Sequence, residues 1–253
     1  MRLLAISDLH VRHRRNREAL EQLSAQPDDW LILAGDLGET VEQCRWVFET
    51  LRPRFARLLW VPGNHELWRE EGLAGQAKYD ALVQACRDFG VDSPEDAYPV
   101  FEGEGGPVTV APLFVGYDYS FAPDGMDVAA AVQWARETGV MCTDEWRLSA
   151  TPWGTREAWC AARVAYSEER LAQVDGATVL VNHFPLRGDL VRLPRIPRFR
   201  IWCGTTATEA WHTRFSARAV VSGHLHLRRT DWIDGTRFEE VSLGYPRHWR
   251  AET

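Results

Sequence analysis

Short apolar runs alternate along the chain with longer segments in which apolar residues recur every three to four positions. The apolar runs predict buried strands, which we place at 2–7, 30–34, 57–61, 107–111, 113–117, 177–181 and 218–222. The amphipathic segments predict helices at 17–25, 40–51, 76–89, 126–137 and 155–174. This alternation favours parallel strands with helices on the faces of the sheet.

The last third of the chain departs from this pattern in two places. Asp234-Gly235, between the runs 227–233 and 236–243, predicts a two-residue hairpin turn. The stretch 185–215 is rich in proline and arginine and has weak periodicity, which for a segment of this length indicates a functional insertion. Because no linker divides the chain, we expect a single domain over 1–253.

Composition and charge narrow the class of protein. The chain has 36 acidic and 29 basic residues, a net charge of −7, so we predict no nucleic-acid partner. Its five cysteines are widely spaced without a C-x-x-C pair, which indicates free thiols in a reducing compartment. No apolar run approaches the ~18 residues of a membrane helix or the ~7–15 residues of a signal-peptide core. We therefore expect a cytoplasmic protein without a membrane partner.

Residues that bind metal ions follow five of the predicted strands. They occur in Asp8-Leu9-His10, Gly35-Asp36, Gly63-Asn64-His65-Glu66, Asn182-His183 and Gly223-His224-Leu225-His226. Taken singly, each has an ordinary explanation, because aspartates cap helices and glycines and asparagines form turns. Together they indicate one site, since ligands bind outside the carboxyl ends of strands in open α/β sheets.

The types of side chain indicate the chemistry of that site. Imidazole and carboxylate suit Zn, Mn, Fe, Co or Ni, and no cysteine is offered with them. The candidate ligands exceed what one ion needs, so we expect two. A shared carboxylate can hold two ions about 3.5–4 Å apart, which is the geometry of two-metal phosphoester hydrolysis.

The ordered series D-x-H, G-D, G-N-H-E, H and G-H-x-H resembles the calcineurin-like metallophosphoesterases over residues 8–226. The resemblance implies an α/β fold of two facing β-sheets flanked by helices, an αββα sandwich. It also implies that one metal is held by Asp8, His10 and His226, that the other is held by Asn64, His183 and His224, and that Asp36 bridges both.

The resemblance further implies a reaction. Two divalent transition-metal ions (Mn, Fe or Zn) would generate a bridging hydroxide that attacks a phosphoester, so Asp36 is catalytic as well as a ligand. His65 would be the second catalytic residue, at the leaving group, and Glu66 would orient a neighbour. The segment 185–215 is then expected near this active site.

The choice of phosphoester rests on finer similarity. Segments 201–206, 211–212 and 238–247 are similar to an actinobacterial branch of the family, which includes 4′-phosphopantetheinyl hydrolases of acyl carrier proteins. The most specific expectation is hydrolysis of that phosphodiester, with arginine-rich segments 12–17 and 187–200 docking an acidic carrier and with Arg195 and Arg198 contacting the substrate.

Two alternatives remain open: a small-molecule phosphatase or nucleotide phosphodiesterase, and a binding scaffold without catalysis.

Outside the motifs, we expect the histidines to lie at the surface or in the core, namely His13, His212 and His248. We expect four tryptophans to pack in the core, namely Trp30, Trp46, Trp60 and Trp68.

Overall fold

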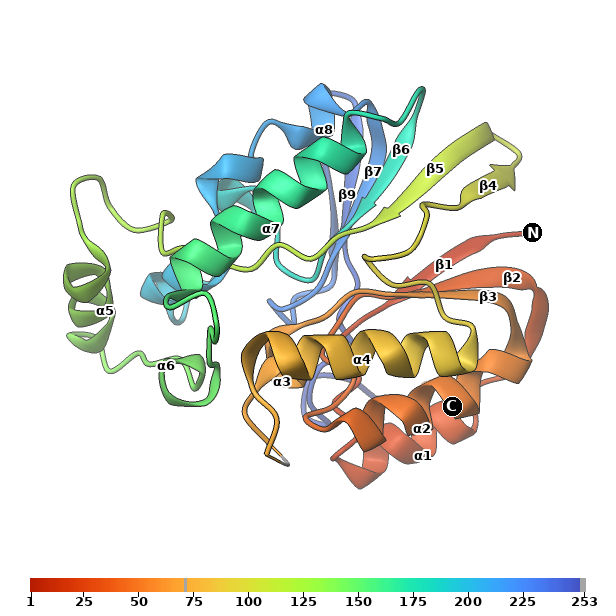
Figure 1. Ribbon diagram of the computed structural model, residues 1–253, viewed down its shortest axis with the longest axis horizontal. Coiled ribbons are helices and arrows are strands. Elements are labelled where there is room, and N and C mark those ends of the chain that lie inside the picture. The colour runs from red at the N-terminus through yellow and green to blue at the C-terminus, as the bar shows by residue number, and fades with distance from the viewer. Residues whose placement is uncertain (71, 251–253) are drawn as a thin grey trace.

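Two β-sheets face each other in the computed structural model, which describes residues 1–70 and 72–250 (Figure 1). The small sheet has the order β1-β2-β3, and all its strands are parallel. The large sheet has the order β4-β5-β6-β7-β9-β8, in which β5, β6, β7 and β9 are parallel and the edge strands β4 and β8 are antiparallel. The strands are β1 (Leu3–Ile6), β2 (Gln26–Leu33), β3 (Phe55–Trp60), β4 (Val100–Gly103), β5 (Gly106–Pro112), β6 (Thr178–Val181), β7 (Ala217–Ser222), β8 (Arg229–Ile233) and β9 (Thr236–Glu240).

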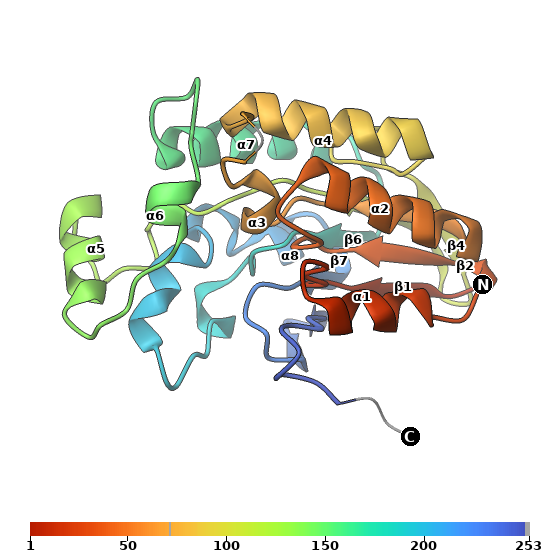
Figure 2. The same ribbon diagram turned by 90° about the horizontal axis from the view of Figure 1, so that it is seen from below.

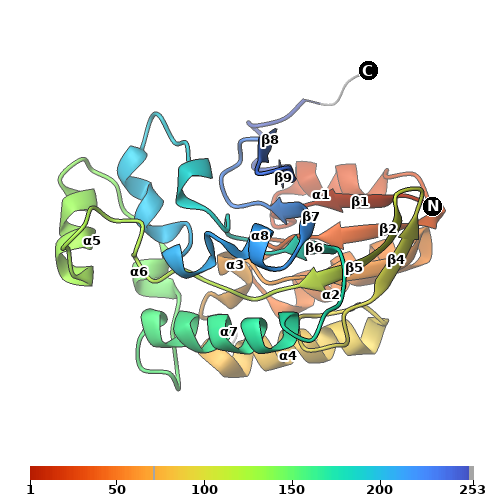
Figure 3. The same ribbon diagram turned by 90° about the horizontal axis from the view of Figure 1, so that it is seen from above.

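Helices cover the outer face of each sheet. Figures 1 and 2 place α1, α2 and α4 over the small sheet, and Figures 1 and 3 place α7 and α8 over the large one. The helices are α1 (Arg14–Glu21), α2 (Val41–Leu51), α3 (Asn64–Leu67), α4 (Gly75–Phe89), α5 (Val128–Arg136), α6 (Asp144–Arg147), α7 (Arg156–Leu171) and α8 (Trp211–Arg214). Short 3-10 helices are η1 (Arg52–Arg54), η2 (Gly188–Leu190), η3 (Pro197–Trp202) and η4 (Thr206–Thr208). The expected α/β fold of two facing sheets flanked by helices is confirmed.

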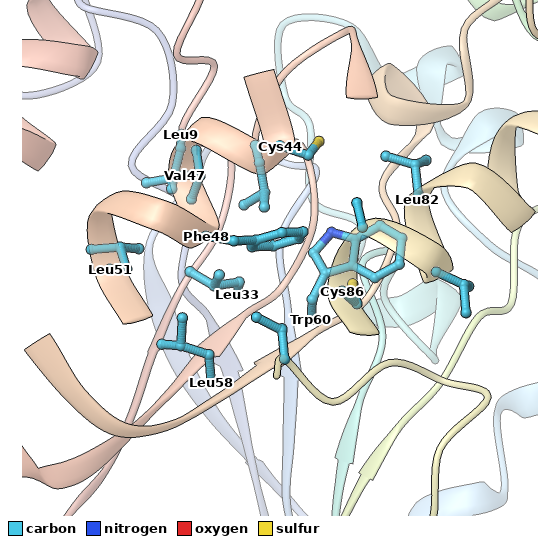
Figure 4. Close-up of a cluster of buried hydrophobic side chains, with 14 of the residues drawn as sticks. Leu9, Leu33, Cys44, Val47, Phe48, Leu51, Leu58, Trp60, Leu82 and Cys86 are labelled. Atoms are coloured by element: carbon cyan, nitrogen blue, oxygen red, sulfur yellow. The ribbon is translucent and has the colours of Figure 1, made fainter. Parts of the chain in front are cut away.

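Strand alternation builds the apolar layers between these elements. In β2, Leu31 and Leu33 belong to the core beneath the helices, whereas Ile32 belongs to the core between the two sheets. A strand covered on both faces needs an unbroken apolar run, which explains the sequence WLILA. Beneath the helices, the ring centroids of Phe48 and Trp60 lie 6.4 Å apart, and Figure 4 shows the two side chains next to each other.

Most predicted elements are present, and their ends follow recognisable signals. Thr40 and Thr155 accept hydrogen bonds from backbone amides in the first turns of α2 and α7, as N-caps do. Asp234 and Gly235 have φ values of 51° and 78°, which confirms the predicted tight hairpin. All five cysteines are free and buried, as expected.

The structure differs from the predicted elements in several places, of which three are instructive. Residues 113–117 form no strand: Asn182 binds the backbone of Val115 through both its side-chain oxygen and its side-chain nitrogen, which takes the place of a strand ladder. The strand β4 was not predicted, because Phe101 is the one buried residue of its four and the segment therefore has no apolar run. The first helix spans Arg14–Glu21 rather than the predicted 17–25, and its buried face consists of Asn16 and Leu20, which leaves little apolar periodicity to mark its ends.

The segment 185–215 is a series of short helices, η2, η3, η4 and α8, of which α8 packs against β7 of the large sheet. Within the described ranges, no helix has both the length and the apolar character that crossing a bilayer requires.

Candidate active site

The candidate ligands lie where the strands of both sheets end. Asp8 and His10 follow β1, Asp36 follows β2 and Asn64 opens α3 after β3. His183 follows β6, and His224 and His226 follow β7. The predicted site residues thus come from five strand ends, and the parallel pairing within each sheet brings these ends to one edge.

The backbone turns sharply at these strand ends. Five candidate residues have positive φ: 55° at Asp8, 41° at His10, 55° at Asp36, 73° at His224 and 54° at His226. Residues with a Cβ rarely adopt this left-handed region, and such conformations gather at functional sites. The turns direct side chains from successive strands toward a common centre.

Two glycines permit the close approach of the turns. A Cβ on Gly63 would lie 2.1 Å from Asp36 Oδ1 and 2.6 Å from its backbone nitrogen. A Cβ on Gly223 would lie 2.3 Å from Ser7 Oγ and 2.5 Å from Asp8 Oδ2. Any larger residue would therefore displace one of the two carboxylates.

The first group of ligand atoms comes from Asp8, His10 and His226. Asp8 Oδ1 lies 2.9 Å from His226 Nε2 and 3.8 Å from His10 Nε2, and the two ring nitrogens lie 3.2 Å apart. The three atoms can therefore ligate one metal ion. The resemblance to the family had grouped the same three residues.

The second group is centred on Asp36. Asp36 Oδ1 lies 3.5 Å from His183 Nε2, and Asp8, Asp36 and His183 bring ligand atoms within 4.8 Å of one another. The His183 and His224 ring centroids are 5.3 Å apart. His183 Nδ1 donates to the carbonyl oxygen of Ala34 at 2.8 Å, which leaves Nε2 to face the cluster.

Buried atoms without hydrogen-bond partners mark the positions where a metal fits. Asn64 Oδ1, His183 Nε2 and His224 Nε2 are buried and have no partner within the described parts of the chain. Buried polar atoms are almost always satisfied, and an unsatisfied one calls for an explanation such as an ion. These are the three residues expected to hold the second metal, so the donor set fits a metal ion.

Burial keeps the imidazoles of His10, His65 and His224 neutral, which is the form that can coordinate a metal. Burial lowers the pKa of His10 to about 3, against the attraction of Asp8. Burial also lowers the pKa of His65 and His224 well below the usual range, and the neighbouring histidines His10 and His183 respectively add to the effect. A neutral imidazole has a free lone pair and can coordinate a metal.

The pKa values of the two aspartates, Asp36 and Asp8, shift in opposite directions. Burial raises the pKa of Asp36 well above its ordinary value, and the nearby carboxylates of Glu66 and Asp8 raise it further. Burial also acts to raise the pKa of Asp8, but the hydrogen bond and charge of His226 bring it well below the usual range. The site therefore concentrates negative charge that a cation would compensate.

A shell of hydrogen bonds fixes both aspartates. Ser7 Oγ (2.6 Å), Ser242 Oγ (2.8 Å) and the His224 amide (3.1 Å) donate to Asp8 Oδ2, which leaves Oδ1 for the cluster. The Glu66 carboxylate accepts from the amides of Asp36 (2.9 Å), Leu37 (2.7 Å) and Gly63 (3.0 Å). Glu66 thus holds the turn that carries Asp36, the orienting role expected from the sequence.

His65 lies against the cluster on an aromatic base. Its Nε2 is 3.7 Å from Asp36 Oδ2, and its ring centroid is 3.7 Å from that of Trp68. Trp68 Nε1 donates to Asp144 at 2.6 Å, so the indole is fixed. Trp68 is buried as expected, but it also lines the active-site cavity, which the assignment to core packing missed.

A cavity of about 760 Å³ opens over the cluster. Its wall combines Asp36, Asn64, His65 and His224 with apolar side chains, which include Trp68, Ile196, Phe199 and Leu225. Phe199 of the 185–215 segment stacks on His224 with ring centroids 5.9 Å apart, which places this segment at the site. The volume is that of a small-molecule site, for which the range is about 300–1,000 Å³.

The two arginines predicted as substrate contacts occupy different places. Arg195 is exposed and lines the cavity. Arg198 is outside the cavity lining, and its guanidinium donates to the carbonyl oxygen of Trp134 and pairs with Glu137 at 2.9 Å. The structure therefore does not bring them together.

Tyr245, His248 and Asp144 contribute to the site without having been selected from the sequence. Tyr245 stacks on His10 with centroids 4.5 Å apart, and His248 Nδ1 lies 3.1 Å from His226 Nδ1. Tyr245 falls within segment 238–247, whose similarity to one branch of the family was the available signal. Asp144 accepts from Asn64 and Trp68 and had no sequence signal at all.

Comparison with known proteins agrees with this geometry. Residues 1–228 match the family described as calcineurin-like phosphoesterase. The chain is 51% identical over 256 residues to the acyl-carrier-protein phosphodiesterase PptH of Mycobacterium tuberculosis, an alignment that covers 98% of this chain and 79% of that protein.

Solved structures agree with the family match. The crystal structure of the phosphopantetheinyl hydrolase PptH from Mycobacterium tuberculosis matches with a TM-score of 0.94 and 50% identity, over 98% of this chain and 91% of that one. The protein TT1561 of Thermus thermophilus matches with a TM-score of 0.50 and 13% identity over 94% of this chain and 87% of that one, a likeness of fold alone.

Proposed function

The chain belongs to the calcineurin-like phosphoesterases, and from this premise we propose that it is a metal-dependent phosphodiesterase that releases 4′-phosphopantetheine from a holo-acyl carrier protein. The observation that carries the proposal is the convergence of Asp8, His10, Asp36, His183 and His226, of which Asp36 and His226 line a cavity whose wall is largely apolar. The 51% identity to PptH supports the choice of substrate.

We assign one metal to Asp8, His10 and His226, and a second to Asn64, His183 and His224, with Asp36 shared. The free buried atoms of Asn64, His183 and His224 support the second set, and the short distances around Asp8 support the first. When bound, two divalent transition-metal ions, Mn, Fe or Zn, supply Lewis acidity toward phosphate oxygens and a nucleophile at neutral pH. Histidine-rich ligation favours such ions over Mg.

The side chain of His65, supported by that of Trp68 beside the cluster, acts on the leaving group. His65 Nε2 faces Asp36 across 3.7 Å and donates to the departing oxygen. Water adds to phosphorus and the bond from phosphorus to the serine Oγ breaks. The hydrogen bond from His65 stabilises the departing oxygen, which takes up a proton released by the attacking water and leaves as the serine hydroxyl. The Trp68 ring holds the His65 imidazole in place during this step.

The cavity wall suits the remainder of the substrate. A phosphopantetheine arm carries a dimethyl group and methylene groups between two amides, and Trp68, Phe199 and Leu225 offer it apolar surface. Arg195 at this wall is the proposed contact for the polar groups of the substrate. The guanidinium of Arg198 is bound at α5, so we propose that Arg198 contributes to substrate binding only indirectly, by holding η3 in position.

The free, buried thiols support a reducing compartment, and we propose the cytoplasm.

Intact mass spectrometry of a holo-acyl carrier protein, after incubation with the Mn-loaded enzyme, tests the proposal. Loss of the whole phosphopantetheine group leaves a free serine, whereas cleavage on the other side of phosphorus leaves phosphoserine, so the mass identifies the bond that breaks. Asp36→Asn and an excess of chelator are the controls, and each should leave the carrier unchanged. A carrier that stays intact with wild-type enzyme, while bis(p-nitrophenyl) phosphate is cleaved, would discard the carrier and direct the search to nucleotides and small phosphoesters.

A further inference from the structure

The position of the scissile bond constrains where a carrier protein can lie. In the substrate of the proposed function, phosphorus is attached directly to the oxygen of a serine side chain. Phosphorus can therefore reach the cluster only if the folded body of the carrier contacts the rim of the cavity. The rim must offer a surface for a protein, separate from the wall that receives the arm.

A second hollow adjoins the catalytic cavity and is more open to solvent. It has a volume of about 790 Å³ and shares Leu193, Pro194, His226 and Leu227 with the cavity. His226 is an assigned metal ligand, so an occupant of this hollow stands beside the cluster. Leu227, with 41% of its surface exposed, lies on the border of the two spaces.

The hollow is cationic although the chain is acidic, with a net charge of −7. Arg192, Arg228 and Arg229 line it. Asp231 pairs with Arg192 at 3.7 Å and with Arg229 at 2.5 Å, so one carboxylate is shared by two arginines. Arg228 is exposed, donates weakly to the Ser242 carbonyl oxygen at 3.4 Å and forms no ion pair within residues 1–70 and 72–250.

The cationic surface continues along the rim of the catalytic cavity. Arg195 and Arg247 line that cavity, and neither forms an ion pair with a carboxylate in the part of the chain that the structure describes. Unpaired arginines on both sides of Leu227 give a positive border with an exposed leucine at its centre. This arrangement fits a partner whose surface carries acidic side chains around a small apolar contact.

We infer that the hollow formed by Arg192, Arg228, Arg229 and Leu227 is the docking surface for an acidic face of the carrier protein next to its modified serine, while the arm enters the catalytic cavity. The inference rests on the proposed function and adds the surface that selects a protein-bound phosphodiester over a free one. Arg228 lies two positions after His226, which is at most about 7 Å along the chain. The docked carrier is thus within reach of the cluster.

Steady-state kinetics of Arg228→Glu on two substrates tests the inference. The substrates are holo-acyl carrier protein and bis(p-nitrophenyl) phosphate, which has no protein body to dock. The ratio of kcat/KM for the carrier to kcat/KM for the small diester should fall roughly tenfold, mainly through KM, because the variant sets a negative charge against an acidic partner. Added salt should lower the same ratio in the wild-type enzyme.

Arg218→Glu is the matched control, because it makes the same change of charge at an exposed residue of β7 far along the strand from its carboxyl end. Its ratio should stay at the wild-type value. Equal ratios for Arg228→Glu, Arg218→Glu and wild type would overturn the docking surface while leaving the proposed function intact. Wild-type enzyme that never cleaves the carrier would instead overturn the proposed function.

Discussion

Asp144 accepts a hydrogen bond from Asn64 Nδ2 at 2.9 Å, although the two residues are 80 positions apart in the chain. This contact fixes the amide of Asn64 so that Oδ1, rather than the amide nitrogen, is the free atom. The same carboxylate oxygen accepts from Trp68 Nε1 at 2.6 Å. One buried side chain therefore orients both a proposed metal ligand and the ring that supports His65.

Replacing Asp144 should weaken metal binding. Asp144→Ala leaves the Asn64 amide free to rotate, and loss of such outer partners costs about 10–100-fold in metal affinity or activity. Metal content, measured by mass spectrometry after dialysis against dilute metal, checks this. Asp144→Asn should retain most of the affinity, because an amide oxygen still accepts from Asn64. Full metal content at wild-type affinity in Asp144→Ala would refute this role.

The sequence predicted which proposed ligands lie together, but it did not predict the residues that pack around them, such as Asp144 and Tyr245. The proposed ligands lie in the turns after buried strands, and parallel strands of one sheet end at the same edge. Local pattern and order along the chain were therefore sufficient to predict that Asp8, Asp36 and His183 lie together, and their role as metal ligands stays a prediction. Asp144 comes from α6, which has four residues and no periodic signal, and it reaches Asn64 only through the path of the folded chain. Tyr245 likewise reaches His10 from beyond β9.

The prediction of strands from local pattern fails for the same reason, because tertiary contacts are not visible in the sequence. The apolar residues at 113–117 predict a strand, yet the amide and carbonyl of Val115 bind the Asn182 side chain, a tertiary contact that no local pattern reports. The two-sheet arrangement followed from resemblance to a family, because alternation of strand and helix is equally compatible with a single sheet.

His65→Ala should separate catalysis from metal binding. His65 Nε2 lies close enough to His10 and Asp36 to act as a ligand, with ligand atoms within 4.8 Å of one another. If His65 acts at the leaving group instead, turnover falls by roughly 10²–10⁴-fold while both metals remain. Parallel measurement of kcat and metal content decides between the two roles. Loss of a metal ion in this variant would make His65 a ligand and remove its assigned role.

A single methyl group at Gly63 should disrupt the shared carboxylate. Gly63→Ala sets a Cβ 2.1 Å from Asp36 Oδ1, and the nearby Asp36 backbone prevents a simple shift. We expect at least roughly a tenfold loss of metal affinity, the scale found when ligand orientation is disturbed. Gly116→Ala is the matched control, because its Cβ meets nothing within 4 Å. Titration of metal into both apo variants compares them, and similar affinities would show that the turn adapts.

Arg195 and Arg198 should respond differently to charge reversal, contrary to their joint selection from the sequence. Arg195 lines the cavity and forms no ion pair in the described ranges, so Arg195→Glu should lower kcat/KM for a holo-carrier by about tenfold with little change in thermal stability.

Arg198 instead ties η3 to α5 through Trp134 and Glu137. Arg198→Glu should cost about 1 kcal/mol of stability by loss of these contacts. The kcat/KM of Arg198→Glu should fall less than that of Arg195→Glu, because the next residue, Phe199, still stacks on His224. Measurements of thermal unfolding and of kcat/KM for Arg195→Glu and Arg198→Glu test both expectations. If Arg198→Glu lowered carrier activity as much as Arg195→Glu at unchanged stability, Arg198 would leave α5 to contact the substrate, as the sequence alone had suggested.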